Sequence, residues 1–486
     1  MHRYHLESAY TPAGWARDVV ATVSDQGIIT ALDPAAGAPA AGDNSTAAAS
    51  PATERVRGIV VPGMANAHSH AFQRGMAGNT EYRLSARDSF WTWRNAMYAL
   101  ANRVEPEELE AIAAQLFVEM LKSGYTTVAE FHYLNRRRDG TPYTDANALW
   151  DAVSRAAAAA GIGLTFLPTL YQSSDFGGKP LRPDQARFES ETEPFIDAVA
   201  RRIAAERHEA AAPFGVERGS EDRRGLTHRT GIAFHSLRAV PLANLHEVSR
   251  RLREIDAGLP IHIHVAEQVL EVKACQRETG KRPIELLLDT GLVDRHWCLV
   301  HATHSVPAEL ERLAGTGAAV CVSISTEANL GDGFFDAAGW LKAGGRLCVG
   351  SDSQSTVSPA EELRWLEYQQ RLRKKRRAVL STARDPHVGT RLWADAARAG
   401  ADALGQPAGA IEVGKRADFL VLDREHPSML GGADDTALDR LLFAGGEAAI
   451  RDVMVGGRWV VKDRRHAKEE ELRRGFGRVM SAFSSK

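Results

Sequence analysis

Apolar runs recur along the middle of the chain, and stretches with helical periodicity separate them. Within each run the apolar residues show little polar alternation, which is typical of parallel strands covered on both faces. Eight runs fit this description: Ile59–Pro62, Thr126–Phe131, Gly163–Tyr171, Gly231–Leu237, Ile261–Glu267, Cys298–His304, Ala318–Ser325 and Arg346–Asp352. Eight β/α units over about 340 residues predict an α/β fold, a TIM-type (β/α)8 barrel.

The helical stretches carry their own start and stop residues. Between Glu107 and Ser123 apolar residues recur on one face, and Gly124 follows as a C-terminal stop. A second helix is predicted to begin at Ser358-Pro359, with serine as the N-cap and proline at the first helical position.

Short strand-like segments with glycine turns return near both ends of the chain. We therefore expect a small β-sandwich-like domain built from both termini. The predicted division is residues 1–57 for its N-terminal part, 58–405 for the barrel, and 406–486 for its C-terminal part and tail. The Ala-, Gly-, Pro- and Ser-rich segment 34–53 predicts a flexible loop.

Composition narrows the classes of function. The 486 residues carry 60 Lys and Arg against 62 Asp and Glu, a net charge of −2, so there is no basic footprint for nucleic acid. We interpret the basic run Arg371–Arg377 as a solvated helix face. No run of about 18 apolar residues occurs and the N-terminus lacks an apolar signal core, so we expect no membrane association. The 4 cysteines are widely spaced, which indicates buried thiols in a reducing cytoplasm.

Histidine or aspartate follows four of the eight predicted strands. His68 and His70 are two residues apart, so in extended chain their imidazoles point to the same side. The fifth run offers His262 or His264, which share a face and which local pattern does not separate. His301 and His304 lie at the end of the sixth run, and Asp352 ends the eighth. Because catalytic side chains of such barrels project from the carboxyl ends of the strands, these residues predict a metal site.

Nitrogen and oxygen ligands together suit zinc and leave a coordination position for water. These residue types do not separate zinc from iron. Glu267 lies three residues after His264 and is a natural proton carrier for a water molecule at the metal. Its alternative interpretation is a surface carboxylate at a strand end.

Seven motifs resemble the formimidoylglutamate deiminase family of the amidohydrolase superfamily. They are NAHSHAFQRGMAG (66–78), DSFWTWRNAMY (88–98), AEFHYL (129–134), FHSLRAV (234–240), HIHVAEQ (262–268), HATH (301–304) and STEANLGDG (325–333). The resemblance covers about residues 55–425. Two departures stand out: Asn135, where the family has histidine, and Ser-Ile-Ser before Thr326, where it tends to have Pro-Thr.

The resemblance implies a set of roles. One zinc ion would be held by His68, His70, His264 and Asp352. Glu267 would be the general acid/base, and His301 would orient the water or the tetrahedral centre. The substrate would contact Gln73, Arg94, Tyr133, His235 and Arg238. The fourth predicted strand offers His235 but no lysine to bridge a second metal.

The implied reaction is hydrolysis of N-formimino-L-glutamate to N-formyl-L-glutamate and ammonia in histidine degradation, by a homodimer. Two arginines at the barrel mouth can each form a forked pair with a carboxylate of this dicarboxylate substrate. Taken alone, each arginine is as well explained by a surface salt bridge. A sibling enzyme that deaminates a nucleobase or another heterocycle is the main alternative, and its pocket would favour aromatic stacking and amide contacts. A non-catalytic scaffold would have lost the ligands that this chain retains.

Overall fold

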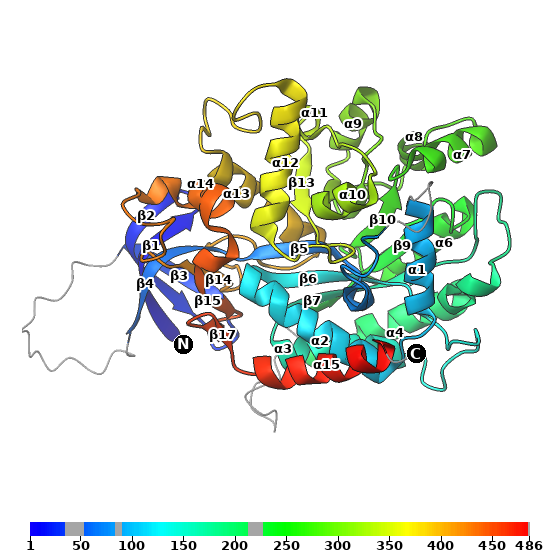
Figure 1. Ribbon diagram of the computed structural model, residues 1–486, viewed down its shortest axis with the longest axis horizontal. Helices are drawn as coiled ribbons and strands as arrows, with labels where there is room; N and C mark the ends of the chain where they lie inside the picture. The colour runs from blue at the N-terminus through cyan, green and yellow to red at the C-terminus, as the bar shows by residue number, and fades with distance from the viewer. Residues whose placement is uncertain (35–52, 83–89, 212–226, 485–486) are drawn as a thin grey trace, which may run out of the picture.

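The computed structural model describes residues 1–34, 53–82, 90–211 and 227–484 (Figure 1). Residues 35–52 of the predicted flexible loop lie outside the described residues. Among the described helices, none is both long and apolar enough to cross a bilayer.

The predicted barrel is confirmed. Eight parallel strands follow one another around it in chain order, and pairing of β6 with β7 closes the ring. These strands are β5 (Met64–Ser69), β6 (Tyr125–His132), β7 (Gly163–Leu170), β9 (Ile232–Ser236), β10 (Ile261–Val265), β11 (Trp297–His301), β12 (Ala319–Val322) and β13 (Arg346–Val349). The short strand β8 (His228–Thr230) pairs with β7 outside the ring.

The prediction of the first barrel strand was wrong. Ile59–Pro62 belongs to β4 (Thr53–Pro62) of a different sheet, and β5 begins two residues later. The run is continuously apolar because β4 lies between two cores. Ile59 and Val61 pack into the barrel core, and Val60 packs into a second core of the terminal sheet. Burial on both faces therefore gave β4 the pattern of a barrel strand.

The small β domain expected from both termini is also confirmed, and in place of a sandwich it forms one continuous eight-stranded sheet with the order β17-β16-β15-β14-β4-β1-β2-β3. Its N-terminal strands are β1 (His2–Thr11), β2 (Gly14–Val23), β3 (Ile29–Pro34) and β4. Its C-terminal strands are β14 (Phe419–Leu422), β15 (Ile450–Val455), β16 (Arg458–Lys462) and β17 (Arg465–His466). β14 pairs antiparallel with β4, which joins the two ends of the chain.

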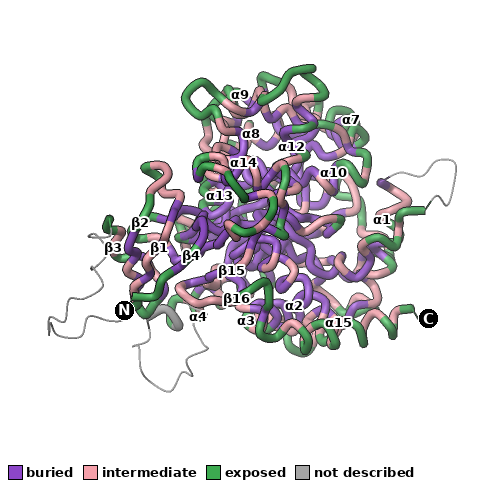
Figure 2. The backbone as a smooth tube through the Cα atoms, turned by 60° about the vertical axis from the view of Figure 1, so that its left-hand side comes forward, coloured by how far each residue is buried: buried purple, intermediate pink, exposed green. Residues whose placement is uncertain are grey.

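Helices surround the barrel, whose strands form the buried centre of the molecule (Figure 2). The longer ones are α1 (Phe90–Ala101), α2 (Pro106–Ser123), α3 (Ala148–Ala160), α4 (Thr192–Ala211), α6 (Leu242–Ile255), α7 (Val269–Thr279), α12 (Pro359–Lys374), α13 (Val388–Ala403) and α15 (Glu469–Ser484). Shorter ones are α8 (Pro283–Leu288), α9 (Pro307–Ala314), α10 (Ile324–Leu330), α11 (Ala337–Lys342) and α14 (Ala437–Arg440).

Single-turn segments complete the described elements: η1 (Ala71–Gly75), η2 (Pro183–Phe188), η3 (Asp434–Thr436), η4 (Leu441–Gly445) and η5 (Gly446–Ala449). The two predicted helix signals hold. Gly124 ends α2 with φ +108°, and the Ser358 hydroxyl accepts the backbone N–H of Glu361 at the start of α12.

Candidate active site

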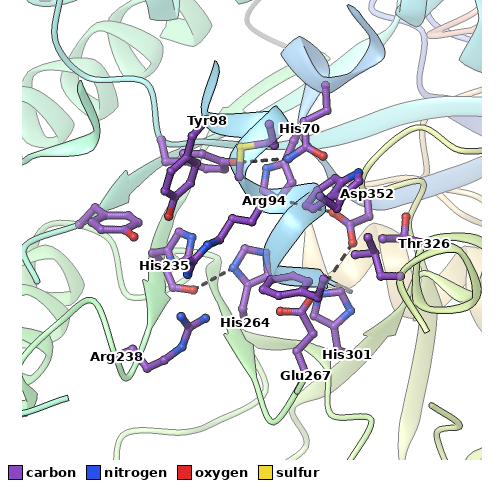
Figure 3. Close-up of a pocket in the computed structure, with 17 residues that line it drawn as sticks. His70, Arg94, Tyr98, His235, Arg238, His264, Glu267, His301, Thr326 and Asp352 are labelled. Carbon is purple, nitrogen blue, oxygen red and sulfur yellow. Dashed lines mark hydrogen bonds and ion pairs between the residues drawn. The ribbon is translucent and has the colours of Figure 1, made fainter. Parts of the chain in front are cut away.

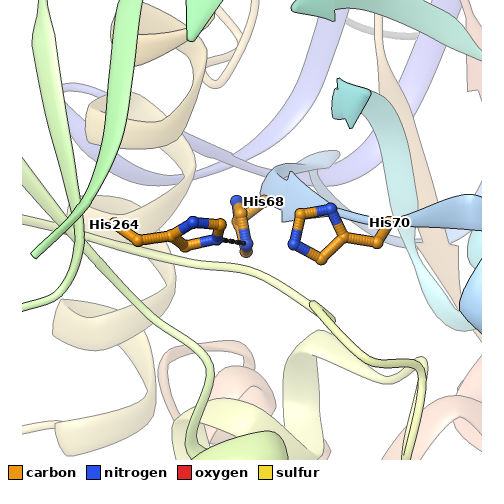
Figure 4. Close-up of side chains that lie close together, drawn as sticks. All are labelled: His68, His70 and His264. Carbon is orange, nitrogen blue, oxygen red and sulfur yellow. Dashed lines mark hydrogen bonds between the residues drawn. The ribbon is translucent and has the colours of Figure 1, made fainter. Parts of the chain in front are cut away.

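Three histidine rings meet inside the carboxyl end of the barrel (Figure 4). His68 lies near the end of β5, His70 follows that strand, and His264 lies in β10. The Nε2 atoms of His68 and His264 are 3.1 Å apart, and the three rings each offer one nitrogen within 4.8 Å of the others. The side chains predicted from the H-x-H spacing and from the fifth strand are thus brought together.

Backbone carbonyls fix the orientation of two of these rings. Nδ1 of His70 donates to the carbonyl of Phe131 at 2.7 Å, and Nδ1 of His264 donates to the carbonyl of His235 at 2.9 Å. Burial lowers the pKa of His70 to about 3 and that of His264 well below its usual range, so both rings are neutral. With the proton on Nδ1, each ring directs its Nε2 lone pair into the cluster. This is the arrangement by which outer hydrogen bonds orient metal-binding histidines.

Asp352 adds a carboxylate to the cluster from the loop after β13. Its Oδ1 lies 3.4 Å from Nε2 of His68 and 3.5 Å from Nε2 of His70. Its backbone has φ +46°, and its N–H donates to the carbonyl of His68 at 3.0 Å. Gly350 permits this approach, because a Cβ there would lie 2.7 Å from Cβ of His68. Although burial raises the pKa of Asp352, the neighbouring His68 and His301 lower it below its ordinary value.

The donor set fits a divalent cation. Nitrogens of neutral imidazoles with their lone pairs turned inward, together with one carboxylate oxygen, form an N/O set that suits zinc. A cation between His68 and His264 would satisfy nitrogen atoms that otherwise face each other at 3.1 Å.

Glu267 and His301 lie beside this cluster, as predicted. Nε2 of His301 is 3.7 Å from Oε1 of Glu267 and 3.8 Å from Oδ2 of Asp352. The other ring nitrogen, Nδ1, is 3.3 Å from Oε1 of Glu327. Burial raises the pKa of Glu267 to about 7. Burial lowers the pKa of His301, but Glu267, Glu327 and Asp352 outweigh it and raise that pKa to about 10.

Two further carboxylates hold the segments that carry these groups. Glu271 accepts the backbone N–H groups of Ala266 and Glu267 at 3.1 and 3.0 Å, which fixes the loop after β10. Glu130 is fully buried and accepts the Ser69 hydroxyl at 2.8 Å and the Ala71 N–H at 2.7 Å. The turn that contains His70 is therefore tied on both sides of the histidine.

A pocket of about 530 Å³, measured with its open mouth, adjoins the cluster and includes His70, His264 and Asp352 in its wall (Figure 3). All five predicted substrate-contacting residues line it: Gln73, Arg94, Tyr133, His235 and Arg238. Sequence reasoning missed the aromatic part of the wall, which includes Trp93, Tyr98 and Tyr171. Trp93 and Tyr98 lie within the motif DSFWTWRNAMY (88–98). Tyr171 is the last residue of a predicted strand, and nothing else in the sequence indicates that it lines a pocket.

Arg94 and Arg238 are half-buried on the His235 side of the pocket, away from Asp352 (Figure 3). Within the described part of the chain neither guanidinium forms an ion pair, and the Nε atoms of both are buried without a hydrogen-bond partner. Burial lowers the pKa of Arg94, and the nearby cations Arg182 and Arg238 lower it further. The Arg94 guanidinium lies 4.4 Å from the centre of the Trp91 ring, which orients it without neutralising it.

Four residues that drew attention in the sequence stay outside the pocket lining. Nε2 of His262 bonds to the carbonyl of Ala403 at 3.0 Å, so His264 alone of that pair joins the cluster. His304 is absent from the lining. Asn135 donates to the carbonyl of Phe188 at 2.8 Å, and the Ser325 N–H donates to Glu362 at 3.1 Å. The residues at both departures from the family motifs therefore make structural hydrogen bonds outside the pocket.

Comparisons with known proteins agree with this geometry. The model of the amidohydrolase family matches residues 59–460. The chain is 47% identical to formimidoylglutamate deiminase of Pseudomonas aeruginosa, over 99% of each chain. It superposes on an amidohydrolase from Brucella melitensis with a TM-score of 0.86 and 39% identity, over 99% of each chain. A zinc-bound adenosine deaminase from Xanthomonas campestris shares the fold, with a TM-score of 0.74 at 21% identity. The chain therefore belongs to the amidohydrolase family and is a hydrolase.

Proposed function

We propose that the chain is a zinc-dependent formimidoylglutamate deiminase, which converts N-formimino-L-glutamate and water to N-formyl-L-glutamate and ammonia in histidine degradation. The observation that carries the proposal is the pair of guanidiniums in the pocket wall that form no ion pair with the described residues. Their position near the histidine cluster calls for a small anion that carries a reactive group. The 47% identity to the Pseudomonas enzyme supports the same substrate.

In this proposal His68, His70, His264 and Asp352 hold one zinc ion. When bound, zinc acts as a Lewis acid that lowers the pKa of a water molecule from about 16 toward about 7. Every ligand segment is already held by backbone or side-chain contacts, so little reorganisation accompanies binding.

Glu267 moves the proton. Its carboxylate takes the two protons of the attacking water in turn, one on attack and one as the intermediate collapses, and delivers each to the terminal nitrogen of the formimino group. The water oxygen replaces that nitrogen on the formimino carbon, the carbon–nitrogen bond breaks, and ammonia leaves. Burial raises the pKa of Glu267 to about 7, which suits a group that must both accept and donate a proton near neutral pH. His301, with Nε2 between Glu267 and Asp352, orients the reacting centre.

The opposite wall binds the glutamate part of the substrate. Arg94 and Arg238 would each pair with one carboxylate in a forked geometry. The amide of Gln73 donates to the Tyr133 hydroxyl at 3.0 Å, which fixes both at the side of His70. With His235, these groups define how far the formimino carbon lies from the cluster. Buried free thiols, as at Cys275, agree with a cytoplasmic location, where they stay reduced.

Release of ammonia from different substrates tests the proposal. The purified, zinc-loaded full chain is assayed with formiminoglutamate, guanine, cytosine and adenosine, and N-formylglutamate is identified as the product. We expect turnover of formiminoglutamate alone. A preference for any of the three heterocycles would reassign the chain to a sibling deaminase and contradict the role given to the arginines.

A further inference from the structure

Helix α12 exposes a row of large apolar side chains. Trp365, Tyr368 and Leu372 are 44%, 37% and 76% exposed. Their spacing of three and four residues places them on one face of the helix. The other side of α12 is buried against the barrel, for example at Leu363 and Leu366. The row is therefore the outer face of a helix that is already anchored in the fold (α12 in Figure 1).

Neighbouring aromatic and arginine side chains widen this row into a patch. The Tyr368 ring lies 5.7 Å from that of Phe443, and the Arg371 guanidinium lies 5.0 Å from the centre of the Phe443 ring. Near the other end Phe334 is 54% exposed and lies under Arg373. Exposed aromatic residues with arginine are the composition that marks the centre of protein–protein interfaces.

The two ends of α12 carry opposite charges. Glu361, which is half-buried, continues the row at the N-terminal end, and the exposed Glu447 accepts a hydrogen bond from the N-cap Ser358. Five exposed cations that form no ion pair with other described residues lie at its C-terminal end and directly after it: Arg373 and Lys374 in α12, then Lys375, Arg376 and Arg377, where the predicted helix face has already ended. A helix face with an acidic end, an apolar middle and a basic end is complementary to itself when two copies run antiparallel.

We propose that α12 packs antiparallel against α12 of a second copy of this chain, across a two-fold axis that passes between Trp365 and Tyr368. Trp365 would then contact the partner subunit's Tyr368, and Glu361 would lie near the partner's basic end. A parallel arrangement would bring the two basic ends together and is disfavoured by their repulsion. The 16 residues of α12 span about 24 Å, enough for the core of an interface of ordinary size.

The mass of the full chain in solution tests the interface. We expect a dimer for the wild type and a monomer for Trp365→Glu, which places a charge in the apolar centre. Leu430→Glu is the matched control, because Leu430 is 64% exposed but lies outside α12. It should remain dimeric. Ammonia release by Trp365→Glu within about twofold of the wild type would show that the variant is folded. A wild type that is monomeric at about 50 µM, a concentration above the Kd of a stable dimer, would overturn the proposal. A Trp365→Glu variant that remains dimeric would also overturn it.

Cysteine cross-linking tests the direction of packing. All four native cysteines are buried, so a single surface cysteine supplies the accessible thiol. In the antiparallel arrangement two copies of position 368 are offset by about 4.5 Å along the helix axes, but two copies of position 372 by about 16 Å. A short bismaleimide should therefore join Tyr368→Cys dimers and leave Leu372→Cys dimers unlinked. Equal linking at both positions would indicate parallel packing and contradict the proposed axis.

Discussion

The two sides of the pocket differ in how far their polar side chains are hydrogen-bonded by the protein itself. On the histidine side, Nδ1 of His70 and Nδ1 of His264 are each bonded to a backbone carbonyl, and Asp352 is tied to the carbonyl of His68. On the arginine side, the Nε atoms of Arg94 and Arg238 have no hydrogen-bond partner. The histidine side is organised before any substrate binds except at the His68 ring, whose Nδ1 has no hydrogen-bond partner, whereas the arginine side is completed only by an anion.

This difference divides the work of catalysis. A side that is already organised can stabilise a transition state without reorganising at the moment of reaction. An unpaired charge in a half-buried wall is costly in the free enzyme, and a bound carboxylate relieves that cost. We therefore expect changes on the histidine side to remove the metal or the chemical step. Changes on the arginine side should weaken binding of the anionic substrate and leave the metal in place.

The largest effect is expected for His70→Ala. Removing one of the converging nitrogens should empty the metal site and abolish turnover, and chelation should inactivate the wild type reversibly. His262→Asn is the matched control, because His262 lies in a barrel strand but bonds to Ala403 outside the cluster. It should keep its metal. Metal content per chain and ammonia release are measured together. Full activity and metal content in His70→Ala would rule out this site.

The next largest effect on turnover is expected for Glu267→Gln. The substitution keeps the shape of the side chain but removes proton transfer, which contributes about 10²–10⁴-fold to catalysis. Zinc content should be unchanged, because Glu267 is proposed not to be a ligand. If the variant instead lost zinc while turnover per remaining zinc stayed normal, Glu267 would be a ligand or a support. Another residue on the histidine side would then have to carry the proton.

Arg238→Met tests the other side of the pocket. We expect kcat/KM for formiminoglutamate to fall by roughly two to three orders of magnitude, or ~3–4 kcal/mol of lost charged hydrogen bonding, with KM raised and zinc retained. Arg94→Met should behave similarly. Formiminoglycine, which lacks one carboxylate, should be a poor substrate and less sensitive to the arginine whose partner it lacks. A change below twofold in both variants would make these arginines surface groups.

Most of the barrel could be predicted from the sequence, because a strand that is buried on both faces consists of an unbroken run of apolar residues. The same rule failed at Ile59–Pro62, because β4 is also covered on both faces, by two different cores. Local pattern shows burial but not which core supplies it. Similarly, His262 and His264 share a face, and only their heights in the barrel separate the histidine of the cluster from the histidine bonded to Ala403.

The supporting contacts of the site were beyond sequence reasoning because they join distant segments. The fully buried Gln185 donates to the hydroxyls of Tyr98 and Tyr171, at 3.3 and 2.9 Å. The equally buried Arg187 donates to the carbonyl of Ala101 at the end of α1, at 2.7 Å. Together they hold the helix that carries Arg94. No periodicity or spacing indicates such contacts, since each partner alone has the features of an ordinary loop or helix residue.

Glu327→Gln should have the smallest effect of the series. Glu327 is fully buried, and its Oε1 lies 3.3 Å from Nδ1 of His301, so it fixes the ring that faces Glu267. Glutamine keeps an acceptor but removes the charge, and losing a charge-assisted hydrogen bond of ~1.5 kcal/mol corresponds to about a 10-fold loss of kcat. KM and zinc content should hardly change, since neither the arginines nor the ligands are touched.

A matched control separates positioning from stability. Glu362 is also fully buried, but it bonds to Ser325 and not to His301. Glu362→Gln should therefore lower the melting temperature without lowering kcat. The measurements are kcat, KM, zinc content and melting temperature for both variants. If the two variants lost kcat equally, Glu327 would act only through the stability of α10 and its surroundings. The histidine side would then be organised by the backbone contacts of His70 and His264 alone.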